Sequence, residues 1–108
     1  PAQRHLHLQD PLLDVMDDYR KRGDEIYADD TMAWVLAAMG RWSQARVYAE
    51  RAVRWSTQDS QVQYHTAIIA LHTGHANEAR QRLQAALATN PQFDPFDADD
   101  GRAQLAKL

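Results

Sequence analysis

The chain repeats itself with a period of 34 residues, and this period restricts its fold more than any other feature. When the sequence is shifted by 34 positions, Ile26–Asp59 aligns with Ser60–Phe93. The two segments are identical at six positions, where ordinary residue frequencies give about two or three matches by chance. Small residues dominate the identical pairs, which are Ala33/Ala67, Gly40/Gly74, Ala45/Ala79, Arg46/Arg80, Ala52/Ala86 and Gln58/Gln92. A period of this length predicts an array of similar units.

Each unit is predicted to consist of two helices separated by a glycine turn. Gly40 and Gly74 each follow about ten helix-favouring residues, and a glycine there can end a helix in the left-handed conformation. Ser43 and Asn77 stand three residues later, and both are favoured at helix N-caps, so we expect them to cap the second helices. The apolar stripes of the second helices are expected at Val47, Ala52 and Val53, and at Leu83, Ala86 and Leu87.

The spacing of glycine and alanine in this unit resembles that of the tetratricopeptide repeat. The first unit contains the run Gly40-Arg41-Trp42-Ser43-Gln44-Ala45 with Ala52 following, and the second contains Gly74-His75-Ala76-Asn77-Glu78-Ala79 with Ala86 and Pro91 following. Trp42 matches the family's aromatic residue after the glycine, Pro91 its closing proline, and Ala33 and Ala67 its small residue in the first helix. The chain departs from the family pattern at Thr57, Ala76, Asp29 and Gln63.

The resemblance implies an all-α fold, an α-solenoid of antiparallel helix pairs with about six helices. We expect residues 1–25 to form an N-terminal extension and a capping helix of a degenerate repeat, residues 26–59 and 60–93 to form two repeats, and residues 94–108 to form a C-terminal capping helix. Asp10-Pro11 predicts the start of the first helix, with an apolar stripe at Leu12, Val15, Met16 and Tyr19. Gly23 predicts its end, and the last helix is expected from about Asp99 to Lys107.

The composition excludes several functional classes. The chain has no cysteine, which excludes disulfides, thiolate metal sites and a thiol nucleophile. Its formal charge of −3 argues against nucleic-acid binding, and it has no apolar run long enough to span a membrane. His65 and His72 lie about 10 Å apart along one helix, too far to share a metal ion, and are expected to face solvent or a partner. We therefore expect no metal, no cofactor and no catalytic residue, and the compartment stays open.

The resemblance places the first helices of successive repeats along a concave groove. The residues expected to face a partner there are Asp30, Trp34, Ala38, Tyr64, Ile68 and His72. Two placements of Trp34 remain open: it lines the groove as an anchor for a peptide, or it packs between repeats as part of the core.

Two functions remain open as well. The first is a non-catalytic protein–protein interaction module of a larger repeat protein, which binds a protein or peptide segment on the concave face. The alternative is a structural role, in which the repeats pack on the rest of their own chain or on a second copy as a homo-oligomer. Because the chain begins at Pro1 rather than at a methionine, we expect it to be a fragment or a processed product.

Overall fold

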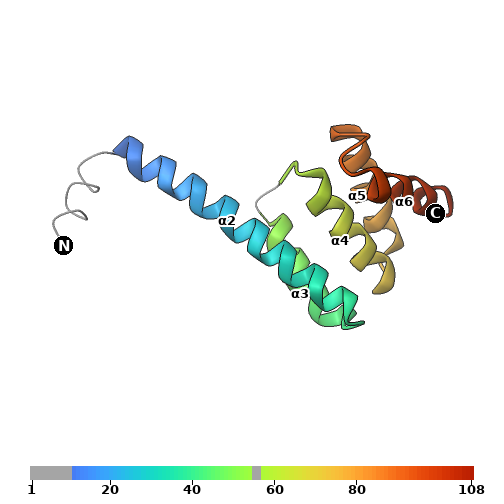
Figure 1. Cartoon of the computed structure of the whole chain (residues 1–108). Helices are drawn as coiled ribbons and strands as arrows, with labels where there is room; N and C mark the ends of the chain where they lie inside the picture. Colours follow the sequence, from blue (N-terminus) through green and yellow to red (C-terminus); the bar gives the residue numbers. More distant parts are fainter. Residues whose placement is uncertain (1–10, 55–56) are drawn as a thin grey trace.

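The structure is a computed structural model that describes residues 11–54 and 57–108. The described residues form five helices and no strand, which confirms the all-α class, although about six helices were expected (Figure 1). Two antiparallel pairs stack on each other, α2 with α3 and α4 with α5, and α6 packs against α4 and α5. The helices are α2 Pro11–Ala38, α3 Trp42–Val53, α4 Ser60–His72, α5 Ala76–Thr89 and α6 Pro95–Ala106.

Both glycine turns have the predicted backbone conformation. Gly40 has a φ of 75° and Gly74 a φ of 81°, in the left-handed region. In the first turn the Arg41 N–H donates to the Leu36 carbonyl, and in the second the His75 N–H donates to the Ala70 carbonyl. These bonds close the turn so tightly that the next helix begins two residues after each glycine.

The tight turn also makes the predicted N-caps wrong. Ser43 and Asn77 are the second residues of α3 and α5, whereas the N-cap positions belong to Arg41 and His75. Neither of these side chains makes a capping hydrogen bond. The main-chain bond that closes each turn therefore fixes the helix start without help from a capping side chain.

The first helix does not end at Gly23, so that predicted helix end is wrong. α2 runs through Gly23 as one helix of 28 residues. A glycine inside a helix costs only about 1 kcal/mol relative to alanine, too little to interrupt a segment with good helix formers on both sides. As a result the N-terminal half of α2, drawn in blue in Figure 1, projects away from the stacked helices.

Part of the sequence-based expectation falls outside the described residues. The expectations concerned are those for residues 1–10, which include His5, His7 and Asp10, and for the side chains of residues 11–20. The apolar stripe at Leu12, Val15, Met16 and Tyr19 therefore stays a prediction, as does the division of the chain into repeats and caps.

The last helix begins four residues earlier than expected. Asp94 is extended and caps α6, because its carboxylate accepts hydrogen bonds from the backbone N–H groups of Phe96 and Asp97. Pro95 follows at the first helical position, where its missing N–H has no cost. Gly101 lies in the middle of α6 and packs against Tyr64 and Leu83, both 3.6 Å from where a Cβ would stand.

The recurring alanines form the contacts between helices, as predicted. All six are at most 1% exposed: Ala33, Ala45, Ala52, Ala67, Ala79 and Ala86. In the stripe of α3, however, Val47 is 50% exposed and its predicted burial is wrong. Ala45, Ala49 and Ala52 take the buried face of α3, and a residue two positions from Ala45 points to nearly the opposite side of a helix.

Candidate functional site

A buried pair of polar residues joins the first helices of the two helix pairs. His65 of α4 lies with its Nδ1 2.9 Å from an oxygen of Asp30 on α2, and the two residues are only 7% and 8% exposed. The His65 ring also stacks on Trp34 of α2, with the ring centroids 4.0 Å apart. The expectation that His65 faces solvent or a partner is therefore wrong, because the ring is enclosed at the joint between α2 and α4.

The same joint continues to α6 through Gln61. The Gln61 side-chain nitrogen donates to Asp97 and lies 3.2 Å from His65 Nε2. An amide nitrogen can only donate, so Nε2 is the acceptor and Nδ1 carries the hydrogen that His65 donates to Asp30. A chain of hydrogen bonds thus links α2, α4 and α6, buried at Asp30 and His65 and partly buried at Gln61 and Asp97.

Tyr64 is the second link between α4 and the last helix. Its hydroxyl donates to Asp100 at 2.6 Å, and its ring, 5% exposed, packs near Trp34 and Phe93. Burial, then the hydrogen bond from Tyr64 to Asp100 and the negative charge of Asp100, raise the pKa of Tyr64 far above its ordinary value. Tyr64 therefore stays protonated and holds α6 against α4.

The six residues predicted to face a partner lie in three rows along α2 and α4. Asp30 and Tyr64 form the buried inner row. Trp34 and Ile68 are half-buried, and Trp34 packs against both apolar clusters of the core. Ala38 and His72 are exposed and form the outer row. The outer row is open to solvent and the middle row is partly so, while the inner row, one helical turn before the middle row on each helix, is buried.

His72 has a partner that the sequence did not indicate. Its ring stacks on Trp42 of α3, with centroids 3.7 Å apart and planes 3° from parallel. Because Trp42 begins α3 and His72 ends α4, the stacked pair joins the two helix pairs at their turn ends (Figure 1). Because His72 belongs to the outer row, the stacked pair gives that row an aromatic edge.

The basic residues of α3 divide into two groups. Arg46 lies 2.9 Å from Glu78 of α5 and 3.0 Å from Glu50, so it links the second helices of the two pairs. Burial opposes the charge of Glu78, but the hydrogen bond and charge of Arg46, together with Arg82, outweigh it and lower the pKa of Glu78. Arg51 is exposed on the same helix, and Arg41 and Arg54 are exposed at its N-cap and C-cap positions.

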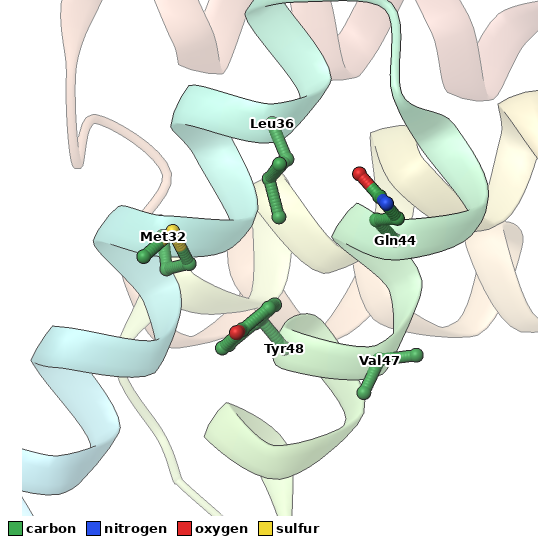
Figure 2. A pocket seen from close by; sticks show the side chains of 5 residues that line it. All are labelled: Met32, Leu36, Gln44, Val47 and Tyr48. Atoms are coloured by element: carbon green, nitrogen blue, oxygen red, sulfur yellow. The ribbon is translucent and has the colours of Figure 1, made fainter.

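A second candidate surface lies on the side of the α2–α3 pair that faces away from α4, and we name it the open face. Met32, Val35 and Met39 of α2 and Val47 of α3 supply its exposed apolar side chains, and Tyr27, whose hydroxyl donates to Asp59 at the start of α4, lies at its edge. Figure 2 shows its central hollow, of about 310 Å³, which is lined by Met32, Leu36, Gln44, Val47 and Tyr48. A second hollow adjoins it along α2 and is lined by Tyr27, Ala28, Thr31, Met32 and Val35.

The open face was not predicted from the sequence, because the N-terminal helix was expected to cover this side of the array. With Gly23 as its end, the N-terminal helix was expected to cap the array as part of a degenerate repeat. With α2 continuous, that segment runs on along the helix axis. The polar joint was missed as well: Asp30 and His65 are 35 residues apart, one repeat period plus one residue, and this spacing alone does not predict a contact.

Within residues 11–54 and 57–108, no group of histidine and acidic side chains is arranged to hold a metal ion. The helices of that part of the chain are also not long and apolar enough to cross a membrane.

A sequence model described as tetratricopeptide repeat matches residues 36–107. The chain belongs to the tetratricopeptide repeat family. The match runs from the last turn of α2 through the whole of α6, so it includes both glycine turns and five of the six recurring buried alanines. No curated protein and no solved structure is significantly similar to the chain.

Tetratricopeptide repeats generally mediate contacts between proteins. The surfaces of the helices are therefore the candidate binding sites. In this tetratricopeptide array α2 packs with α3 and α4 with α5, and α6 contacts α4 and α5. The array offers two surfaces to another protein. One is the row of residues along α2 and α4, and the other is the open face.

Proposed function

We propose that the chain is a non-catalytic protein-interaction module and that it binds a partner segment across the first helices. The surface that a partner touches consists of Trp34 and Ala38 on α2 with Ile68 and His72 on α4. The buried Asp30 and Tyr64, one turn earlier on each helix, hold these helices in place through their bonds to His65 and Asp100. The supporting observation is the register of α2 and α4 within a tetratricopeptide fold. Residues one repeat period apart occupy equivalent positions of α2 and α4, and Trp34, Ala38, Ile68 and His72 all keep accessible surface, which supports one strip across the two helices.

The chemistry of this strip suits a peptide with an apolar residue and an acceptor group. Ile68 and the accessible edge of Trp34 offer apolar surface at the centre. The His72 ring, held flat against Trp42, is prevented from folding over the strip and presents its edge to solvent. A partner that contacts these groups buries a preformed surface, which keeps the ordering cost of binding low.

The test is peptide selection followed by affinity measurement. A random peptide library is selected against the immobilised chain, and the affinity of a selected peptide is measured by fluorescence polarisation. We expect Ala38→Arg to weaken binding at least about tenfold, which corresponds to about 1.4 kcal/mol, because a long side chain then covers the strip. Ala85→Arg is the matched control, since it makes the same change at an exposed position of α5.

Equal affinity of the Ala38→Arg and Ala85→Arg variants would refute binding on the strip. A peptide whose affinity falls with Met32→Glu instead would place the partner on the open face. Selected peptides that bind neither the strip nor the open face would refute the proposal that the chain binds a partner at this site.

A further inference from the structure

One of the links from α4 to α6 runs through the side-chain amide of Gln61, in the first turn of α4. The amide nitrogen carries two hydrogens, and it donates to the Asp97 carboxylate and to Nε2 of His65. Because an ionised carboxylate only accepts hydrogen bonds, the nitrogen rather than the oxygen of the amide faces Asp97. This orientation satisfies both neighbours only while Nε2 of His65 carries no hydrogen.

A second proton on the His65 ring reverses the requirement at this position. The charged ring donates from both nitrogens, so Nε2 then needs an acceptor where the Gln61 nitrogen now lies, 3.2 Å away. The amide supplies one by turning over, which exchanges its oxygen and its nitrogen. The oxygen then faces the Asp97 carboxylate as well, and two acceptors with no hydrogen between them repel each other. Gln61 therefore serves either protonated His65 or Asp97, but not both.

The titratable groups beside His65 come from three helices. Asp30 of α2 accepts from Nδ1 in either protonation state, so the bond between α2 and α4 survives. The Tyr64 ring of α4 has its centroid 5.9 Å from that of the imidazole, and its hydroxyl is engaged with Asp100. Asp97 of α6 lies beyond the amide. A second proton on His65 thus changes the contact with α6 and leaves the contact with α2 in place.

The surroundings of Gln61 leave room for the amide to turn. Gln61 is half-buried and lines a hollow of about 330 Å³ between the start of α4 and the end of α5. Asp59 lines the same hollow, but its carboxylate already accepts from Tyr27 and from the first backbone N–H groups of α4. Because Gln61 and Asp97 both keep accessible surface, the turn of the amide requires no rearrangement of the core.

From this arrangement we infer that His65, Gln61 and Asp97 form a proton-controlled switch, which we name the amide switch. While His65 is neutral, Gln61 binds Asp97 and holds the first turn of α6 against α4. When the ring takes up a second proton, Gln61 turns to His65 and releases Asp97. Imidazole side chains generally titrate between pH 5 and pH 8, so the first turn of α6 loosens as pH falls through this range.

The contacts of α6 are few enough for this loss to matter. Of the twelve residues of α6, only Ala98 and Gly101 are buried. The hydrogen bond from Tyr64 to Asp100 holds the second turn and is not part of the switch. We therefore expect the first turn of α6 to loosen rather than the whole helix to detach. The inference is independent of the proposed function, because the binding strip contains no residue of the amide switch.

The test is a pH titration of the whole chain by NMR, from about pH 7.5 to about pH 5.5. The ring nitrogen resonances of His65 report which nitrogen carries hydrogen and when the second proton binds. Amide hydrogen exchange, corrected for its intrinsic dependence on pH, reports the opening of α6, with α3 as the internal reference. As His65 takes up its proton, we expect exchange in the first half of α6 to quicken about fivefold relative to α3, the effect of losing one hydrogen bond.

Two substitutions fix the switch in one state. Gln61→Glu presents an oxygen to both neighbours, so exchange in α6 should be fast at every pH and should not respond to His65. In Asp97→Asn the new amide pairs with either orientation of Gln61, because it offers both a donor and an acceptor. Exchange in α6 should therefore stay slow in Asp97→Asn while His65 still takes up its proton. His75→Gln is the control, since it removes an exposed imidazole outside the switch and should respond as the wild type does.

Four outcomes would overturn the inference. The first is a His65 ring that carries its hydrogen on Nε2 at the upper pH or takes up no second proton over the range. The second is exchange in α6 that stays constant while His65 is protonated. The third is an equal rise of exchange in α3 and α6, because acid would then loosen the whole array. The fourth is an Asp97→Asn variant that responds as strongly as the wild type.

Discussion

His65 Nδ1 donates to the Asp30 carboxylate at 2.9 Å, and this bond joins two helices through a site that is almost closed to water. The ring is fixed on three sides, by Asp30, by Gln61 and by the stacked face of Trp34. A buried carboxylate is costly unless it is paired, so the pair sets which rotation of α2 fits against α4. The joint is thus specific as well as stabilising.

This pairing predicts different effects for two substitutions of Asp30. Asp30→Asn keeps an oxygen that accepts from Nδ1, so we expect only a small loss of stability. Asp30→Ala leaves the His65 N–H buried without an acceptor, and we expect a loss of about 1–3 kcal/mol. Urea unfolding measures both. Equal losses in the two variants would mean that the hydrogen bond contributes little and that packing around the side chain dominates.

The second prediction concerns the helix contacts made by alanine. Ala86 is 1% exposed in the apolar cluster with Tyr64, Ala67 and Leu83, which leaves no room for a larger side chain. Ala86→Leu should therefore overpack the contact and lower the free energy of unfolding by about 1–3 kcal/mol. Ala85→Leu, at the exposed neighbouring position, is the control and should unfold at nearly the wild-type urea concentration.

The sequence predicted these alanines and the glycine turns because both depend on local rules that recur every 34 residues. Gly40 needs a left-handed backbone, and Ala45 needs to be small, in the first unit as in the second. The joint at Asp30 and His65 was not predicted, since it depends on how far α2 is rotated about its axis. A rotation of one residue position changes which side chains meet α4, and helical periodicity alone does not fix it.

The end of α2 illustrates a second limit of sequence reasoning. A glycine after a basic run is a common helix end, yet at Gly23 the helix continues. Gly23 and Gly40 differ in the residues that surround them. At Gly40 two backbone hydrogen bonds close a turn onto α2, whereas the segment after Gly23 continues with helix formers. Because α2 continues through Gly23, the residues before Gly23 do not fold back over the open face.

The third prediction separates the structural and binding roles of Trp34. Trp34 packs against both apolar clusters and stacks on His65, so Trp34→Ala should lower the free energy of unfolding by about 3 kcal/mol. Its accessible edge belongs to the proposed strip, so affinity for a selected peptide should fall as well. Unfolding and affinity are measured on the same variant, with the affinity corrected for the folded fraction. Unchanged stability would contradict the packing role.

The last prediction is a loss of stability at high pH that depends on Tyr64. Its pKa is raised in the folded chain, whereas in the unfolded chain it titrates near the ordinary value of 10.0. Below pH 10 both states hold the proton, and the stabilising contact with Asp100 is fully present. Above pH 10 the unfolded state releases a proton that the folded state retains, so the free energy of unfolding falls as pH rises.

Tyr64→Phe tests this prediction because it removes the titrating group and keeps the ring. The variant loses the hydrogen bond to Asp100, so it should be less stable than the wild type at pH 8 by about 1 kcal/mol. Its stability should then decline less steeply between pH 10 and pH 11.5. Tyr27→Phe is the comparison: the hydrogen bond to Asp59 raises the pKa of Tyr27 as well, but that side chain is exposed. Urea unfolding at half-unit pH steps gives the three slopes, and a wild-type slope no steeper than that of Tyr64→Phe would show that Tyr64 is not the group responsible.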